Sequence, residues 1–433
     1  MFLTHRFYIG FAIVILLIGS GYWWLPLFTV GRLALALFAL AVLIDITLLY
    51  MKSGIEAGRY MADRFSNGDW NHVRIDIQNS YPFPTRLTVM DEAPPFEKKG
   101  GETSWDKALS SVLHYYRPTR RGAYQFGYIR IFVQTRLGLV ERRYTCGQPQ
   151  EVKVYPSYLM LRKYELLAHS NRLSELGLKR IRRIGHDTEF EQIRDYVQGD
   201  DFRTINWRAT ARRSQLMVNV FQDERSQHIF SVIDKGRVMQ QAFRGMTLFD
   251  YAINASLVLS YVAMHREDKA GMLTFSNTLD TYLPAQRSPG HMQEILESLY
   301  AQQTDFGETD YSVLIDHVVR HVSKRSLLIL YTSFATAAAM RRQLPYMLQL
   351  SRWHRVLVVF FQDEELRQYT HEKATTAEDY YRHVIAEKTL YEQRLIVSQL
   401  QQHGILALLT TPDQLSVDVI NKYLELKQTN RVT

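Results

Sequence analysis

Two long apolar runs open the chain. Residues 7–27 and 33–50 are almost entirely apolar, and short segments such as "TVGR" separate them. Each run has about the ~20 residues that a helix needs to cross a bilayer. The pattern predicts a transmembrane hairpin over residues 1–52. A cleaved signal peptide would explain only the first run and would leave the second without a role.

The charges around these runs predict how the hairpin is oriented. His5 and Arg6 precede it, and Lys52 follows it. The turn between the two runs contributes only Arg32. Because Lys and Arg are enriched on the cytoplasmic side of membrane proteins, we expect both ends of the hairpin, and the soluble domains, to face the cytoplasm.

One carboxylate interrupts the second apolar run. Asp45 lies near the C-terminal end of that run. A charge inside a bilayer is costly, so an intramembrane carboxylate raises a functional question. Because Asp45 is close to the end of the run, we expect it to reach the membrane interface or a neighbouring helix.

Alternating apolar and polar positions follow the hairpin. The segments "WNHVRIDIQN", "TRLTVMDEAP", "GAYQFGYIRIFVQT" and "EVKVYP" alternate with a period of two, as half-buried strands do. Gly, Pro and charged residues separate them as turns. We therefore expect a small antiparallel β-sandwich over residues 67–156. The short basic stretch before it, residues 53–66, is expected to be a helical juxtamembrane segment.

The last two hundred residues, 223–433, alternate between short apolar runs and amphipathic stretches. "HIFSVID", "KAGMLTFS", "SLLILYTS", "RVLVVFFQ" and "GILALLT" have the length and composition of strands that are buried on both faces. The stretches between them show helical spacing. This order predicts a doubly wound α/β domain with a parallel sheet, in which ligands bind at the carboxyl ends of the strands.

Composition narrows the classes of function. With 46% hydrophobic and 22% charged residues the chain is globular in character, and its net charge of +8 suits an anionic partner, either lipid or nucleic acid. The single cysteine, Cys146, excludes an intrachain disulfide framework and a Cys-based zinc site. Cys146 ends a predicted strand, which favours a structural role over a nucleophilic one.

Residues 157–222 are polar and basic, and their first half is expected to be helical. The run "KRIRR" at residues 179–183 favours a surface close to anionic lipid. Recognition of nucleic acid would also require aromatic platforms or a reading helix. The sequence shows neither, so we expect no nucleic-acid partner.

The densest group of opposite charges lies in the same region, in "YVQGDDFRTINWRATARRSQ" at residues 196–215. Asp200 or Asp201 could cap a short helix and pair with Arg212, and Trp207 could cover the pairs. Three interpretations stay open. The group is an ion-pair network that fixes how the β-sandwich docks on the α/β domain, a surface for a partner, or a catalytic pair of carboxylates.

The order of these parts resembles the bacterial DUF58 family over nearly the whole chain. The resemblance rests on "RLGLVER" and "VKVYPS" at the end of the β module, and on "FEQIRDYVQGDDFRTINWRATARRSQLMVNVFQDE", which leads into the α/β module. It implies that the last domain has a von Willebrand factor A-like fold. The interaction residues that it implies are Arg194, Tyr196, Gly199, Asp200, Asp201, Arg203, Trp207 and Arg212.

Some von Willebrand factor A domains bind a metal through an Asp-x-Ser-x-Ser motif, a loop Thr and a second Asp. Carried over to this chain, Asp234 matches the first carboxylate and Thr309 the loop Thr. Gly236 and Val238 stand where the serines belong. Ser333 stands near the expected second Asp. Too few oxygen ligands remain for a tight divalent site, so we expect a degenerate site and no metal or other cofactor.

The resemblance also implies a function. It is that of a membrane-anchored, non-catalytic scaffold or adaptor in the bacterial inner membrane, which works with a MoxR-type AAA+ ATPase in the maturation or assembly of protein complexes. Other membrane proteins are further candidate partners. The chain has no Walker A pattern, so nucleotide hydrolysis would come from the ATPase. The alternatives are a metal-dependent adhesion or receptor domain and, less favoured, a hydrolase that uses Asp200 and Asp201.

Overall fold

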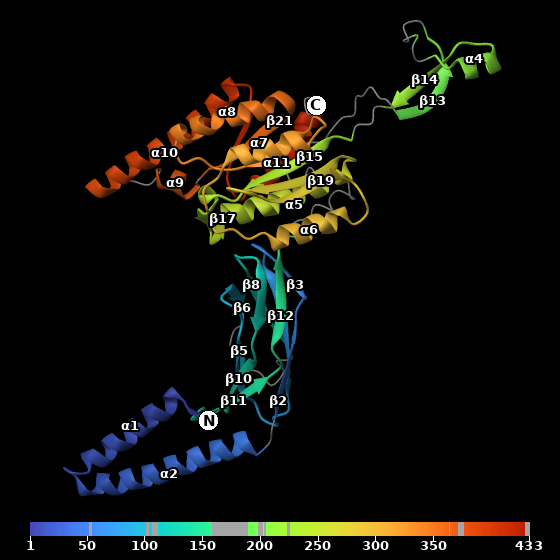
Figure 1. The fold of residues 1–433 in the computed structure, drawn as a ribbon. Coiled ribbons are helices and arrows are strands. Elements are labelled where there is room, and N and C mark those ends of the chain that lie inside the picture. The colour runs from blue at the N-terminus through green and yellow to red at the C-terminus, as the bar shows by residue number, and fades with distance from the viewer. Residues whose placement is uncertain are drawn as a thin grey trace. The chain divides into compact units, whose positions relative to one another are not determined.

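The structure is a computed structural model of the 433-residue chain. It describes residues 1–51, 54–100, 104–105, 111–157, 189–197, 202, 205–222, 226–362, 364–370 and 376–428. The chain divides into two compact units, Met1–Tyr155 and Pro156–Thr433. Both contain helices and sheets, so the chain is a mixed α/β protein (Figure 1).

The first unit begins with two apolar helices, α1 (His5–Ser20) and α2 (Leu25–Tyr50). Within the described residues, Pro26–Tyr50 is the one helical segment long and apolar enough to cross a bilayer, because α1 has only 16 residues. The two helices pack closely. A Cβ atom on Gly10 would lie 2.7 Å from Phe38, and one on Gly31 would lie 3.1 Å from the backbone nitrogen of Ile18.

Strands make up the rest of the first unit and form three sheets, with the orders β1-β11-β10-β5-β7, β2-β4-β8-β6 and β3-β12-β9. All pairs are antiparallel except β3 with β12. The strands are β1 (Phe2–Leu3), β2 (Ile55–Tyr60), β3 (Arg64–Ser66), β4 (Asn71–Asn79), β5 (Arg86–Asp91), β6 (Glu97–Gly100), β7 (Ser104–Trp105), β8 (Ser111–Arg117), β9 (Gly122–Phe126), β10 (Ile129–Gln134), β11 (Val140–Cys146) and β12 (Gln150–Tyr155).

The segment at residues 53–66 is not the helix that its basic composition suggested. Residues 55–60 form β2, which pairs with β4 from Ile55 opposite Asn79 to Tyr60 opposite Arg74. Residues 64–66 form β3. The sequence was misleading here because Arg59 looks like a surface residue, whereas its side chain is buried and forms an ion pair with Asp91.

Asp45 binds the β strands and not a second helix. Its side chain is 0% exposed and accepts hydrogen bonds of 2.9 Å from the backbone amides of Leu139 and Val140, where β11 begins. The Thr135 hydroxyl also donates to it. Leu49, one turn further along α2, is buried in the same apolar core as Ile131 and Val140. The last turns of α2 therefore belong to the core of the β strands.

The C-terminal end of α2 is held by side chains from two strands. The carbonyl oxygen of Leu49 accepts hydrogen bonds from the Arg142 guanidinium (2.6 Å) and the Tyr81 hydroxyl (2.8 Å). A helix leaves its last carbonyls without intrahelical donors, so these two groups supply what the helix cannot. Together with Asp45, they fix two successive turns of α2 to the first unit.

A six-stranded sheet forms the centre of the second unit, in the order β19-β18-β15-β20-β21-β22. All its pairs are parallel except that of β18 with β19 (Leu279–Gln286), an edge strand that the sequence did not predict. The other strands are β15 (His228–Asp234), β18 (Lys269–Phe275), β20 (Leu327–Tyr331), β21 (Arg355–Phe361) and β22 (Leu406–Thr410).

Helices cover both faces of this sheet (Figure 1). Ile229 and Ile233 of β15 belong to the core on one face, and Phe230 and Val232 to the core on the other. The first face is covered by α5 (Leu248–His265), α6 (His291–Ala301) and α11 (Leu415–Gln428), and the second by α7 (Tyr311–His321), α8 (Ala337–Trp353) and α10 (Ala377–Gln402). The short elements are η3 (Arg237–Met239), β16 (Ala242–Phe243), β17 (Met246–Thr247) and α9 (Glu364–Tyr369).

A small hairpin precedes the sheet in the chain. β13 (Glu189–Asp195) pairs antiparallel with β14 (Met217–Gln222), and the short helix α4 (Trp207–Arg213) lies between them in sequence. Of the basic segment expected at residues 157–222, residues 158–188 lie outside the described residues.

A histidine is buried without a partner in the first unit. Neither ring nitrogen of His114 has a hydrogen-bond partner in the part of the chain that the structure describes, and the residue is fully buried. Burial lowers the pKa of His114, and the nearby Lys98 lowers it further, whereas Asp91 acts in the opposite direction.

We expect His114 to make the stability of the protein dependent on pH. The pKa of His114 is lower in the folded state than the unfolded value of about 6.5. As the pH falls below 6.5, the unfolded chain binds a proton that the folded chain does not bind, so the free energy of unfolding decreases. His114→Leu should flatten this part of the curve. Melting temperatures of the full chain between pH 8 and pH 5 measure the effect, and an unchanged slope in the variant would contradict it.

Removing the Asp45 side chain should destabilise the protein strongly. Asp45→Ala leaves the amides of Leu139 and Val140 buried without acceptors, at a cost on the order of 2–4 kcal/mol. Thr47→Ala is the matched control, because Thr47 is exposed on the same helix and bonds only to the carbonyl of Ile44. Thermal unfolding of both full-length variants in detergent tests this, and equal melting temperatures would refute it.

Candidate functional site

Asp234 ends β15 at the centre of the sheet, which is where folds of this kind place a ligand. Its carboxylate is 1% exposed. Oδ1 accepts hydrogen bonds from the Thr309 hydroxyl (2.7 Å) and the Gly236 amide (2.8 Å), and Oδ2 accepts one from the Thr332 hydroxyl (2.7 Å). Both carboxylate oxygens therefore have donors from the chain itself.

The hydroxyls around Asp234 form a chain that extends into the core. Tyr311, at the start of α7, lies with its hydroxyl 2.9 Å from Thr332 Oγ1. Since Thr332 donates its proton to Asp234, Tyr311 donates to Thr332. Burial raises the pKa of Asp234, and the hydrogen bonds from Thr309, Thr332 and Gly236 oppose that increase. The result is a buried carboxylate whose hydrogen-bonding capacity is used internally.

Gly236 leaves no space for the serine side chain that a metal motif would place there. A Cβ atom at this position would lie 1.8 Å from Thr309 Oγ1. The loop threonine therefore occupies the volume in which a serine ligand would stand. Val238 points to the apolar core instead, where it packs against buried side chains.

Ser333 does not join this group. It lines a separate, very small hollow with Phe334 and Gln393, whose volume of about 10 Å³ is enough for roughly one water molecule. No hydrogen bond connects Ser333 with Asp234 among the residues that the structure describes. The described residues also contain no cluster of three His, Cys, Asp or Glu side chains. One carboxylate and two hydroxyls supply fewer oxygen ligands than the roughly six or more that a divalent cation takes.

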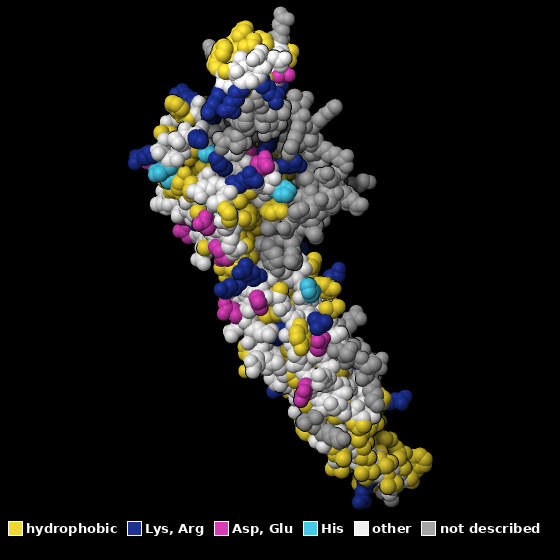
Figure 2. Space-filling model, turned by 90° about the vertical axis from the view of Figure 1, so that its right-hand side faces the viewer, with side chains coloured by type: hydrophobic (Ala, Val, Ile, Leu, Met, Phe, Trp, Pro, Cys, Tyr) yellow, Lys and Arg dark blue, Asp and Glu magenta, His cyan; other side chains and the backbone are white. Residues whose placement is uncertain are grey.

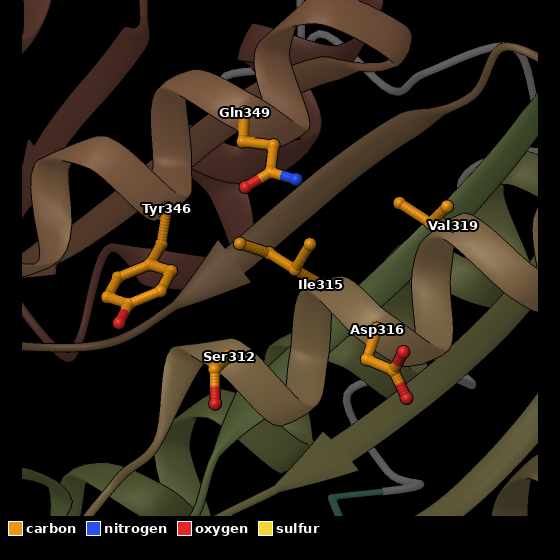
Figure 3. Close-up of a pocket in the computed structure, with 6 residues that line it drawn as sticks. All are labelled: Ser312, Ile315, Asp316, Val319, Tyr346 and Gln349. Atoms are coloured by element: carbon orange, nitrogen blue, oxygen red, sulfur yellow. The ribbon is translucent and has the colours of Figure 1, made fainter.

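A larger hollow lies between α7 and α8. Its volume is about 250 Å³, and Figure 3 shows its lining side chains. Asp316 is the one charged residue in the lining, and it already forms an ion pair with Arg320 at 2.6 Å. A shallow groove of this kind lacks the convergent polar groups of an active site.

The interaction residues expected from the sequence are only partly described. Gly199, Asp200, Asp201 and Arg203 lie outside the described residues. Arg194 and Tyr196 are half-buried at the end of β13. The helix cap that was expected of Asp200 or Asp201 is instead Asn206, whose side chain accepts a hydrogen bond from the Ala209 amide at 3.0 Å.

Trp207 is exposed within its own unit. Its side chain is 69% exposed at the start of α4, and Phe202 nearby in the sequence is exposed as well. Arg208, Arg212 and Arg213 are exposed on the same helix. An indole with arginines on one exposed element is the composition of an interface hot spot. We call Trp207, Arg208, Arg212 and Arg213 the α4 surface.

Two side chains that surround Asp234 were missed by reasoning from the sequence. Thr332 follows β20 directly, one position before Ser333, and its hydroxyl completes the environment of Asp234. Tyr311 supports it from α7. A hydroxyl immediately after a buried strand next to β15 was the signal for Thr332. Ser333 was assigned to the site only because it stands near the expected second Asp of the metal motif.

Comparison with known proteins gives a family for part of the chain. Residues 192–374 match the family described as "Protein of unknown function DUF58". The chain is 24% identical over 268 residues to the uncharacterized protein YeaD of Bacillus subtilis (strain 168). That alignment covers 59% of this chain and 65% of YeaD, so the chain spans slightly less than two thirds of the relative's length.

Two solved structures align with the chain at low TM-scores. Proximal thread matrix protein 1 from the mussel byssus aligns with a TM-score of 0.27 and 10% identity, over 47% of each chain. The CARDB domain of the PF1109 protein from Pyrococcus furiosus aligns with a TM-score of 0.17 and 15% identity, over 24% of this chain and 93% of that domain. Neither score supports an argument about fold or function.

Gly236 lies in close contact with Thr309, whereas Gly307 in the same region has space around it. We therefore expect a serine substitution to lower stability much more at Gly236 than at Gly307. Gly236→Ser should cost on the order of 1–3 kcal/mol, because the new side chain overlaps Thr309. Gly307→Ser should change stability by less than about 0.5 kcal/mol, since its Cβ would meet nothing closer than 3.8 Å. Chemical denaturation of both variants measures the difference, and a neutral Gly236→Ser would show that the site can open.

Proposed function

We propose that this chain is a membrane-anchored, non-catalytic scaffold that works with a MoxR-type AAA+ ATPase in the maturation or assembly of protein complexes. The observation that carries the proposal is the closed environment of Asp234. Each oxygen of this carboxylate is bonded to groups of the chain itself. Folds of this class bind ligands at the carboxyl ends of their strands. In this protein the carboxylate at that position is used in hydrogen bonds within the chain.

The apolar helices support the membrane anchor. Most large apolar side chains of α1 and α2 are exposed, and they gather over these helices in Figure 2. Pro26–Tyr50 is long enough to cross a bilayer, and the close packing at Gly10 and Gly31 favours α1 as a second, shorter span beside it. With His5 and Arg6 in the first turn of α1, the positive-inside bias favours a cytoplasmic location for both units.

The α4 surface supports binding to a protein partner. Exposed Trp and Arg side chains are the residue types that contribute most to binding energy at interfaces. Their exposure within their own unit leaves them accessible to a partner. The ATPase as the partner rests on the resemblance to DUF58 proteins, and it would supply the hydrolysis for which this sequence has no Walker A pattern.

A crosslinking pull-down of the tagged full-length protein from native membranes tests the proposal. We expect an ATPase with Walker motifs to be recovered, and its yield to depend on whether ATP or a non-hydrolysable analogue is present. Trp207→Ala and Arg212→Ala should each reduce recovery about tenfold or more, as hot-spot truncations do. Trp353→Ala and Arg352→Ala are matched controls, because Trp353 is 65% exposed and Arg352 is exposed beside it on α8.

Three results would argue against parts of the proposal. Recovery of no ATPase would refute the proposed partner. Equal loss in the α4 and the α8 variants would show that the α4 surface is not the contact. Loss accompanied by a large fall in melting temperature would make the α4 side chains structural.

A further inference from the structure

The turn between β10 and β11, residues 135–139, is fixed to the start of α1 as well as to α2. The Thr4 amide donates to the carbonyl of Leu139 (3.1 Å), and the Thr4 hydroxyl donates to that of Gly138 (2.5 Å). Thr4 also caps α1. Because Asp45 of α2 binds the amides of Leu139 and Val140, both apolar helices meet the same turn.

The length of α2 places this turn at one surface of the bilayer. From Leu25 to Asp45 the helix rises about 30 Å, at ~1.5 Å per residue, which equals the thickness of the hydrocarbon core. Tyr22, Trp23 and Trp24 are exposed at the opposite end, where aromatic side chains mark the other interface. The turn at residues 135–139 therefore lies at the depth of the lipid headgroups.

The exposed side chains on this turn, and those of Phe2 and Arg6 beside it, are apolar or basic. Leu137 is 48% exposed, and Phe2 of β1 is also exposed. Arg6 and Arg136 are exposed as well, and Arg136 has no partner among the residues that the structure describes. We call Phe2, Arg6, Arg136 and Leu137 the collar. The nearest acidic side chain on β11, Glu141, accepts a hydrogen bond from Gln134.

We propose that the collar binds the headgroups of anionic phospholipids, with Leu137 and Phe2 inserted among them. The inference rests on the membrane anchor proposed above and adds a second contact with its own lipid preference. Lipid suits this surface better than an acidic protein does, because the helices that hold the turn bring it against the bilayer. Each arginine near an anionic membrane surface adds about fivefold to binding.

The test uses the full-length protein in liposomes of phosphatidylcholine with a small fraction of a nitroxide-labelled lipid. In a Cys146→Ala background, Leu137→Cys carries a fluorescent label, and Leu113→Cys is the matched control. Leu113 is 49% exposed, on β8. Leu113 pairs with Arg74 of β4, and the end of β4 nearest α2 is Asn79. At ~3.3 Å per residue, Leu113 therefore lies about 17 Å from that end of the strand.

We expect nitroxide lipid to quench the label at Leu137 several-fold more than the label at Leu113. Nitroxide-labelled phosphatidylglycerol should quench more than the phosphatidylcholine analogue at low salt, and added salt should remove that difference. Arg6→Gln combined with Arg136→Gln should remove it too, while quenching by the phosphatidylcholine analogue stays unchanged.

Equal quenching at Leu137 and Leu113 would overturn the proposal, because the turn would then not touch lipid. Equal quenching by the two lipids would overturn the preference for anionic headgroups. Flotation of the liposomes separates these results from a failure of the anchor itself. Protein that does not float lacks the membrane attachment, whereas protein that floats without quenching at Leu137 lacks only the collar contact.

Discussion

A carboxylate removed from water has to receive hydrogen bonds or an opposite charge, and this requirement joins distant segments throughout the chain. Asp45 accepts hydrogen bonds from the amides of a turn about ninety residues away. Asp91 forms an ion pair with Arg59 and accepts a hydrogen bond from the Tyr116 hydroxyl. Asp268 accepts hydrogen bonds from Lys427 and Tyr423, which connects the last helix to the start of β18. Asp234 accepts hydrogen bonds from threonines of two loops. Loss of the donors at any of these sites would leave a buried charge without compensation, so each strongly specifies its tertiary contact.

Asp45 and Asp234 meet this requirement with different sets of hydrogen-bond donors. At the strand ends of the second unit, Asp234 receives hydrogen bonds from two threonine hydroxyls and one backbone amide, so neither of its oxygens lacks a donor. Asp45 receives hydrogen bonds from two backbone amides and the Thr135 hydroxyl, so most of its bonding does not depend on which side chains surround it. The exposed side chains of the turn at residues 135–139 take no part in binding Asp45, so they are available for the lipid contact that we propose.

Most elements could be predicted where one local signal was strong. The buried strand β15 and its parallel neighbours are continuous apolar runs, and α2 is a single apolar run of sufficient length. Elements whose apolar side chains are few were missed. β19 contains Asp280 and Pro284 and lies at the sheet edge, and β2 contains an arginine that turns inward. The partner of a buried charge, such as Asp91 for Arg59, depends on long-range pairing that no local pattern contains. Asn206 could have been predicted as the cap of α4, because it precedes the helix directly, but the acidic residues before it drew the assignment away.

The separation of Asp45 from its partners also sets an order of events during synthesis. The amide of Leu139 is made 94 residues after Asp45. At ~5–20 residues per second, α2 emerges about 5–20 s before the turn that donates to Asp45 exists. During that interval Asp45 has no donors from this turn. For the membrane anchor that we propose, this order means that the helices insert while Asp45 is hydrated at the membrane surface, and that the β strands fold onto them afterwards.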